Sequence, residues 1–226
     1  MFKLFVFLLC LMAFSAHAER PQIEFGLGIT HATHQDNMTW WQEEFPHSLR
    51  MNSPSLSVGL KGVLRESVAG FERINWRAGY EYLGKFRSTA LATASDADYG
   101  ACRYDLNKCW PLSHWAGVGA VQGLYATLQP EIDMGTYSIF FEGGVSAYYS
   151  TWKVDIPDWR PTREGPVQSL TATHKAKWQI TYMLGLGVRK GPVSLAYTIR
   201  RAEATGDLFP AIYHDKAHNV SLRYAF

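Results

Sequence analysis

The feature of this sequence that most restricts its fold is an alternation of apolar with polar or small residues, which recurs along almost the whole chain. Successive side chains of a β-strand point to opposite faces, so such an alternation gives a strand one apolar face. In QIEFGLGIT (22–30), the apolar residues are Ile23, Phe25, Leu27 and Ile29. Helical periodicity is nowhere sustained, so we predict an all-β protein.

Seven further segments alternate in the same way, and the fourth strand is the least regular because Gln122 falls on its apolar face. They are SLSVGLKGV (55–63), RINWRAGYEYL (73–83), GVGAVQGLYATLQ (117–129), IFFEGGVSAYYST (139–151), KWQITYMLGLGV (177–188), VSLAYTIR (193–200) and HNVSLRYAF (218–226). Connections of roughly 15 to 30 residues alternate with connections of roughly 4 to 9. We predict an eight-stranded antiparallel up-and-down transmembrane β-barrel with four long extracellular loops and three short periplasmic turns.

The two faces of the predicted strands differ in volume. The apolar face carries bulky residues such as Trp76, Phe141 and Trp178, whereas glycines such as Gly26, Gly59 and Gly144 lie on the opposite face. The interior of an eight-stranded barrel is just wide enough for side chains to fill, so the bulky face should point outward to lipid. The alternative is a secreted soluble barrel of the lipocalin type with its apolar face inside.

The N-terminus has the three parts of a secretory signal: Lys3, an apolar run over 4–14, and Ala16-His17-Ala18. We therefore expect a cleaved signal peptide over residues 1–18 and one barrel domain over residues 19–226. The net charge is only +2, which argues against nucleic acid as a partner.

Together, the signal peptide, the eight alternating segments, the loop asymmetry and the aromatic C-terminus resemble the small outer-membrane barrels of the OmpA/OmpX type. The resemblance implies insertion into the outer membrane of a Gram-negative bacterium, with outer-membrane lipids and lipopolysaccharide as neighbours. It also implies that the assembly machinery reads the last strand, with Tyr224 and Phe226 as its aromatic signal. The resemblance does not indicate an activity.

Charged residues of both signs fall on the inward face of the predicted strands. They are Glu24, Lys61, Arg77, Glu81, Glu142, Arg189, Arg200 and Arg223. A desolvated charge without a partner is very costly, so these residues should form a salt-bridge network that plugs the lumen. The alternative is a narrow, porin-like pore that uses the basic excess to prefer anions.

A lipid A-modifying enzyme, either an acyltransferase or a deacylase, is the third functional alternative. It would need a histidine with a serine or an acid near the outer rim, and the candidates are His31, His214, His218 and Ser221. His218 and Ser221 fall on opposite faces of one strand, so they should not meet. Because no motif supports catalysis, we predict no catalytic residue, metal or cofactor.

The long loops carry aromatic residues that could recognise a surface ligand or lipopolysaccharide, or could instead anchor the loops at the membrane interface. They are Trp40, Trp41, Trp110 and Trp115. Cys102 and Cys109 are the only cysteines after residue 18, and we expect a disulfide that staples the longest loop. A structural or adhesive surface role carried by the loops is therefore our expected function.

Overall fold

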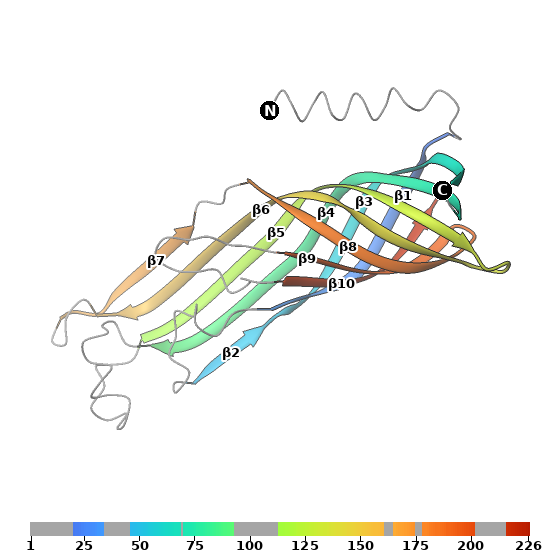
Figure 1. Ribbon diagram of the computed structural model, residues 1–226. Coiled ribbons are helices and arrows are strands. Elements are labelled where there is room, and N and C mark those ends of the chain that lie inside the picture. Colours follow the sequence, from blue (N-terminus) through green and yellow to red (C-terminus); the bar gives the residue numbers. More distant parts are fainter. Residues whose placement is uncertain are drawn as a thin grey trace.

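The computed structural model describes residues 20–33, 46–68, 70–92, 113–160, 165–174, 178–201 and 216–226, and all its regular elements are β-strands (Figure 1). The strands are β1 (Gln22–Ala32), β2 (His47–Arg50), β3 (Asn52–Val68), β4 (Phe71–Ala92), β5 (Ser113–Asp133), β6 (Ser138–Trp159), β7 (Gln168–His174), β8 (Trp178–Lys190), β9 (Val193–Arg201) and β10 (Lys216–Ala225). The predicted all-β class is confirmed.

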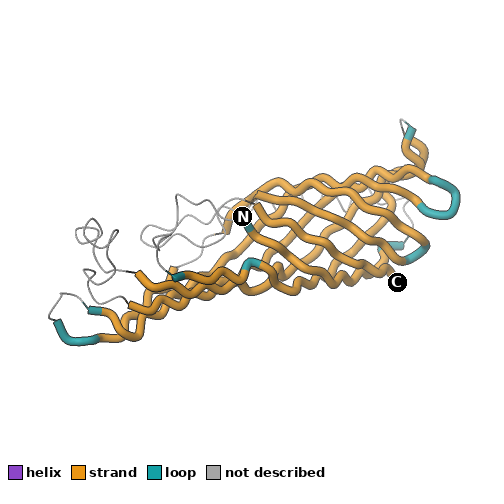
Figure 2. The backbone as a smooth tube through the Cα atoms, turned by 90° about the horizontal axis from the view of Figure 1, so that it is seen from below, coloured by secondary structure: helices purple, strands orange, loops and turns teal. Residues whose placement is uncertain are grey.

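Eight of these strands close into an antiparallel ring in the order β1, β3, β4, β5, β6, β8, β9, β10 and back to β1. The closing pair joins the two ends of the chain, from Glu24 opposite Ala225 to Ala32 opposite Ala217. Ring closure satisfies the backbone hydrogen bonds that an open edge would leave unpaired. The expected up-and-down barrel of eight strands is thus confirmed, and Figure 2 shows its crossing strands.

Three strands run much further than the sequence pattern predicted. β4, β5 and β6 contain 22, 21 and 22 residues, and they project beyond the ring as a sheet extension (Figures 1 and 2). The short strand β2 pairs with β4 on one side of this extension, and β7 pairs with β6 on the other. Part of the sequence predicted as long loops is therefore β-sheet. The described residues contain ten strands in all, rather than the eight predicted.

At the opposite end of the barrel, three tight connections define the turn end, and we call the end with the extension the loop end. The connections lie at Gly70, at Met134–Tyr137 and at Gly191–Pro192, so they are shorter than predicted. Gly135 and Gly191 have φ values of 85° and 56°, which glycine adopts without a steric penalty. The C-terminus also lies at the turn end (Figure 1).

The outward face of the ring is apolar and exposed, whereas the inward face is polar or small. We call the outward set the apolar belt: Phe25, Leu27, Ile29, Leu56, Val58, Leu60, Tyr80, Leu124, Leu128, Phe141, Val145, Ile180, Tyr182, Leu184, Leu186, Leu195, Val220 and Leu222. The irregular Gln122 also lies on this side, where it accepts a hydrogen bond from the Tyr80 hydroxyl at 2.7 Å. Inside, a Cβ on Gly144 would lie 2.1 Å from the Ala126 carbonyl oxygen, so small residues are required there.

Candidate functional site

The lumen contains the charged side chains that the alternation placed on the inward face. All eight are at most 8% exposed, and they come from seven of the eight ring strands. They are Glu24, Lys61, Arg77, Glu81, Glu142, Arg189, Arg200 and Arg223. Residues that pair directly across antiparallel strands share a face of the sheet. Every second residue of each strand therefore points into the barrel, which brings these residues, distant in sequence, into one interior.

Arg77 joins the central group of the lumen. Its Nε donates to Glu24 Oε1 at 2.6 Å, and one of its terminal nitrogens donates to Glu142. Glu142 also accepts a hydrogen bond from Arg223 at 2.7 Å and one from the Thr127 hydroxyl at 3.0 Å. Two carboxylates and two guanidinium groups thus neutralise one another in the interior, where an uncompensated charge would be costly.

A second group lies nearer the loop end and is built around Glu81. Both the Arg200 guanidinium and the Tyr148 hydroxyl donate to the Glu81 carboxylate. Arg200 also donates to the Thr198 hydroxyl at 3.0 Å, and its guanidinium carbon lies 5.5 Å from the centroid of the Tyr148 ring. The group combines an ion pair with a cation–π contact, so it connects three strands across the lumen.

A third group, nearer the turn end, depends on an acid that sequence reasoning missed. Glu131 is 1% exposed and accepts hydrogen bonds from Arg189 and, at 2.6 Å, from Asn75 Nδ2. The predicted fourth strand ends at Gln129, so Glu131 falls in the predicted turn. β5 instead continues to Asp133, so Glu131 shares the inward face with Gln129, and the continued alternation was the signal that could have revealed it.

Lys61 is the exception among the eight residues. The other seven form ion pairs, but Lys61 makes no hydrogen bond or ion pair with the residues that the structure describes. It is nevertheless only 8% exposed. Its side chain borders a cavity at the turn end of the barrel.

A small cavity lies near the centre of the lumen. The cavity bordered by Arg77, Glu81 and Arg223 has a volume of about 20 Å³, which is room for roughly one water molecule. Around this cavity, the charged side chains are carboxylates and guanidinium groups that form ion pairs with one another.

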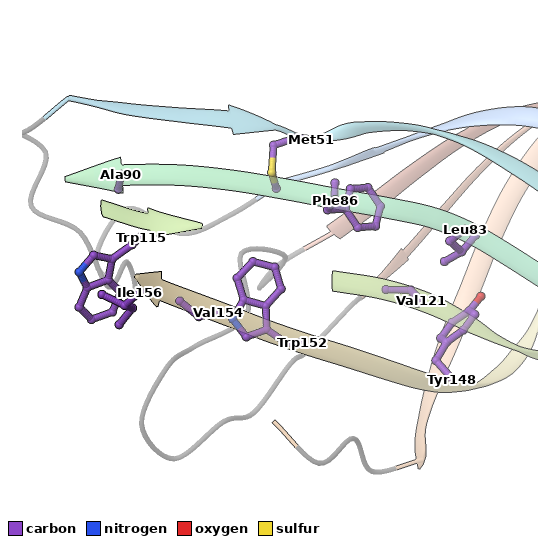
Figure 3. Close-up of a cluster of buried hydrophobic side chains, with 11 residues drawn as sticks. Met51, Leu83, Phe86, Ala90, Trp115, Val121, Tyr148, Trp152, Val154 and Ile156 are labelled. Carbon is purple, nitrogen blue, oxygen red and sulfur yellow. The ribbon is translucent and has the colours of Figure 1, made fainter. Parts of the chain in front are cut away.

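The interior of the sheet extension is apolar instead (Figure 3). We call this group the apolar cluster: Ala32, Met51, Leu83, Phe86, Ala90, Trp115, Val121, Tyr148, Trp152, Val154 and Ile156. The predicted position of Trp115 on a recognition loop is wrong, because Trp115 lies in β5 with only 6% of its surface exposed. Trp115 is thus part of the packing that lets the extension stand beyond the ring.

An exposed polar pair lies on the extension, outside the apolar belt. The Asp158 carboxylate accepts hydrogen bonds from the His114 backbone amide at 2.7 Å and is 2.6 Å from His114 Nδ1. Partial burial raises the pKa of Asp158, but the hydrogen bonds from His114 outweigh it and hold the pKa below its ordinary value.

Of the candidate catalytic residues, His31 and His218 lie side by side across the closing strands, with ring centroids 6.5 Å apart. Each has a different partner: His31 Nδ1 is 2.7 Å from Asn52 Oδ1, and His218 Nδ1 is 2.6 Å from the Tyr197 hydroxyl. Ser221 points into the lumen, where its hydroxyl accepts a hydrogen bond from Arg223 at 3.0 Å. The predicted separation of His218 from Ser221 is therefore observed.

Several predicted residues lie outside the described ranges: the signal peptide, Trp40, Trp41, Trp110, Cys102, Cys109 and His214. The terminal aromatic residues are described. Phe226 is 70% exposed and contacts Phe25 and Tyr224 edge to face, with ring centroids 5.8 and 4.6 Å apart. Its backbone amide donates to the Ile23 carbonyl at 2.9 Å, which ties the chain end to the first strand.

The described residues contain no helix that is long and apolar enough to span a membrane, and no group of three or more side chains placed to hold a metal ion. No protein-family model and no curated protein matches the sequence.

Solved structures with a similar course of the chain include Neisserial surface protein A, with 9% identity, coverage of 92% of this chain and 99% of that one, and a TM-score of 0.40. Ail, the attachment invasion locus protein of Yersinia pestis, has 9% identity, 91% and 97% coverage and a TM-score of 0.41. The translocator domain of the autotransporter NalP from Neisseria meningitidis has 10% identity, 98% and 94% coverage and a TM-score of 0.33. The fold assignment itself rests on the strand pairing of this chain.

Proposed function

We propose that this chain is an integral outer-membrane β-barrel of a Gram-negative bacterium, with its short turns toward the periplasm. The apolar belt is the single observation that carries this proposal, because it surrounds a closed ring and includes Leu27 and Tyr182 at 71% and 80% exposure. A soluble monomer rarely exposes contiguous apolar patches larger than a few hundred Å². Hydrocarbon solvates such a surface, and a closed ring leaves no unpaired strand edge in it.

Refolding into detergent micelles, followed by electrophoresis with and without boiling, tests the membrane barrel. We expect the unboiled protein to migrate as a compact species and the boiled protein at its full apparent mass. Refolded protein that remains monodisperse in buffer without detergent would support the soluble alternative instead.

We further propose that the lumen is closed rather than conducting. The ion pairs around Arg77 and Glu81 and the cavity of about 20 Å³ at the lumen centre support this proposal. Planar-bilayer recordings of the purified protein should therefore show no reproducible open steps. Steps of constant size, with preference for anions, would favour the porin-like pore.

We propose that the surface role is carried by the loop end, where β4, β5 and β6 extend beyond the ring. Its buried packing supports this proposal, because a rigid base loses less conformational entropy when a ligand binds. Trp40, Trp41 and Trp110 remain the residues that we propose for recognition, with Cys102 and Cys109 stapling the longest loop. Purified lipopolysaccharide is one defined probe: the W40A/W41A variant should bind it more weakly than the parent, and equal binding would remove these residues from the proposal.

No observation at the rim favours a lipid A-modifying enzyme over this non-catalytic role. Ser221 points into the lumen and is only 6% exposed, so it is not placed to act as the nucleophile beside His31 or His218. Mass spectrometry of lipid A from cells with and without the protein tests this point directly. An acylation pattern that changes only in expressing cells would establish an enzyme.

Assembly is proposed to depend on the terminal aromatic residues. The Phe226 ring is 70% exposed, so its contacts alone contribute little to folding. We expect deletion of Phe226 to lower the amount of membrane-inserted protein in cells while refolding in micelles stays nearly normal. Unchanged insertion in cells would contradict a signal role for this residue.

A further inference from the structure

The cavity that Lys61 borders lies at the turn end of the barrel, at the opposite end from the apolar cluster. Its volume is about 320 Å³, and four cationic side chains line it: Arg20, Lys61, Arg73 and Arg189. We propose that this cavity binds a phosphate group.

Lys61 is the first reason. The side chain is 8% exposed, and its ammonium group makes no hydrogen bond or ion pair with the described residues, although every other predicted lumen charge does. A buried cation without a partner is strongly unfavourable, whereas a bound anion would compensate it. Lys61 borders the cavity, so an anion there would be within its reach.

The excess of positive charge around the cavity is the second reason. Arg189 pairs with Glu131, and the same carboxylate lies 4.0 Å from Arg73. Arg73 has one further acidic partner, Glu72, at 3.3 Å, with about 40% of both side chains exposed. Glu131 and Glu72 are therefore the carboxylates that pair with this cationic set within 4.0 Å among the described residues. Glu24 also attracts Lys61 and Arg189, but its carboxylate is paired with Arg77, and no acidic side chain lines the cavity itself.

The arrangement of the donors indicates the class of anion. Lys61, Arg73 and Arg189 come from β3, β4 and β8, so they approach the cavity from separate strands. A tetrahedral oxyanion offers acceptor oxygens in several directions at once, and lysine and arginine are the usual phosphate-binding side chains. The phosphate could belong to a phospholipid headgroup of the inner leaflet or to a small phosphate compound in solution.

Calorimetry with pyrophosphate tests the site, using the full barrel refolded in an uncharged maltoside detergent. We expect saturable binding with one site per chain. Lys61→Met keeps most of the apolar stem and removes the charge, so it should weaken binding by at least roughly tenfold. Lys190→Met is the matched control, because Lys190 is an exposed lysine of β8 at the same end and does not line the cavity; its affinity should stay within about twofold of the parent.

Two membrane environments then distinguish the sources of phosphate. If the site holds a lipid headgroup, nanodiscs of phosphatidylcholine, which carries a phosphate but no net charge, should suppress pyrophosphate binding relative to maltoside micelles, which carry no phosphate. Equal binding in the two would assign the site to a soluble phosphate compound. Heat-modifiable mobility of each variant confirms that it is folded.

The proposal is overturned if the parent protein binds no pyrophosphate in maltoside, or if Lys61→Met binds as tightly as the parent. An equal loss in Lys61→Met and Lys190→Met would also overturn it, because binding would then reflect general surface charge. The site depends on the observed barrel and not on the proposed surface role, so the membrane tests and this one can fail separately.

Discussion

The inward faces of β4, β5 and β6 have opposite character in the ring and in the sheet extension. In the ring, these faces carry Arg77, Thr127 and Glu142, while the outward faces belong to the apolar belt. In the extension, the inward faces form the apolar cluster, and exposed polar residues such as Lys85, Arg87 and Lys153 lie outside. The apolar residues thus move from the outward face of these strands to the inward face within one sheet. In the proposed membrane location, this change would mark the border between hydrocarbon and water.

The change is abrupt and structurally marked. On β4, the register shifts between Tyr82 and Gly84, where Gly84 has a φ of 111° and the Lys85 amide donates to the Ser53 hydroxyl at 2.7 Å. A β-bulge of this kind bends a strand and re-aims its side chains. Tyr148 belongs to both regions, because its ring joins the apolar cluster and its hydroxyl donates to Glu81.

The largest effect on stability is expected from Glu142→Ala in the ring. The substitution leaves Arg77 and Arg223 without a carboxylate partner they share, and breaking a buried pair typically costs about 3–5 kcal/mol. Urea unfolding in lipid vesicles measures this loss. Asp155→Ala is the control, because its pair with Lys153 is exposed, and it should leave the midpoint almost unchanged.

Ile156→Ala should destabilise the extension while leaving the ring folded. Ile156 is 0% exposed in the apolar cluster, and truncation of a buried isoleucine costs roughly 2–5 kcal/mol. Limited proteolysis should show faster cleavage at the loop end, with heat-modifiable mobility unchanged. If the whole barrel lost its compact mobility, the two regions would form one cooperative unit and the comparison would fail.

Leu186→Arg tests the outward side of the ring. Leu186 is 54% exposed in the apolar belt, and a charged residue on the lipid face costs about 2–4 kcal/mol at the bilayer midplane. Vesicle refolding yield and urea midpoints should both fall. Thr89→Arg, at an exposed position of β4 in the extension, is the matched comparison and should be tolerated.

His114→Ala should produce the smallest effect. The pKa of Asp158 is held below its ordinary value by hydrogen bonds from His114, although partial burial acts in the opposite direction. A lowered folded-state pKa stabilises the fold above the ordinary pKa, and the contribution is lost as the pH falls through the lowered value. Because the backbone hydrogen bond remains, the variant should raise the Asp158 pKa only part of the way, as followed by carboxyl NMR.

The alternation of apolar and polar residues was sufficient to predict the ring, the apolar belt and the pairing of β1 with β10. The face to which each strand residue points is a local property, so it can be read from the sequence. Eight lumen charges were identified in this way, and all of them are buried. Alternation does not show where a strand ends. The predicted connections therefore include Glu131 and Trp115, although the alternation of β5 continues through both residues. In the extension, Trp152, Val154 and Ile156 reverse the rule that apolar residues point outward, and only their long-range packing reveals this reversal.

The central claim is that the outward face of β6 contacts lipid in the ring and water in the extension. Paramagnetic relaxation of backbone amides in bilayer nanodiscs tests this claim most directly, because it compares positions along one strand. A lipid-soluble agent should broaden the amides of Phe141 and Val145 on β6, and a water-soluble gadolinium chelate should broaden those of Lys153 and Asp155. Equal broadening of all four amides by the water-soluble agent would contradict a membrane-embedded ring with an extension in water.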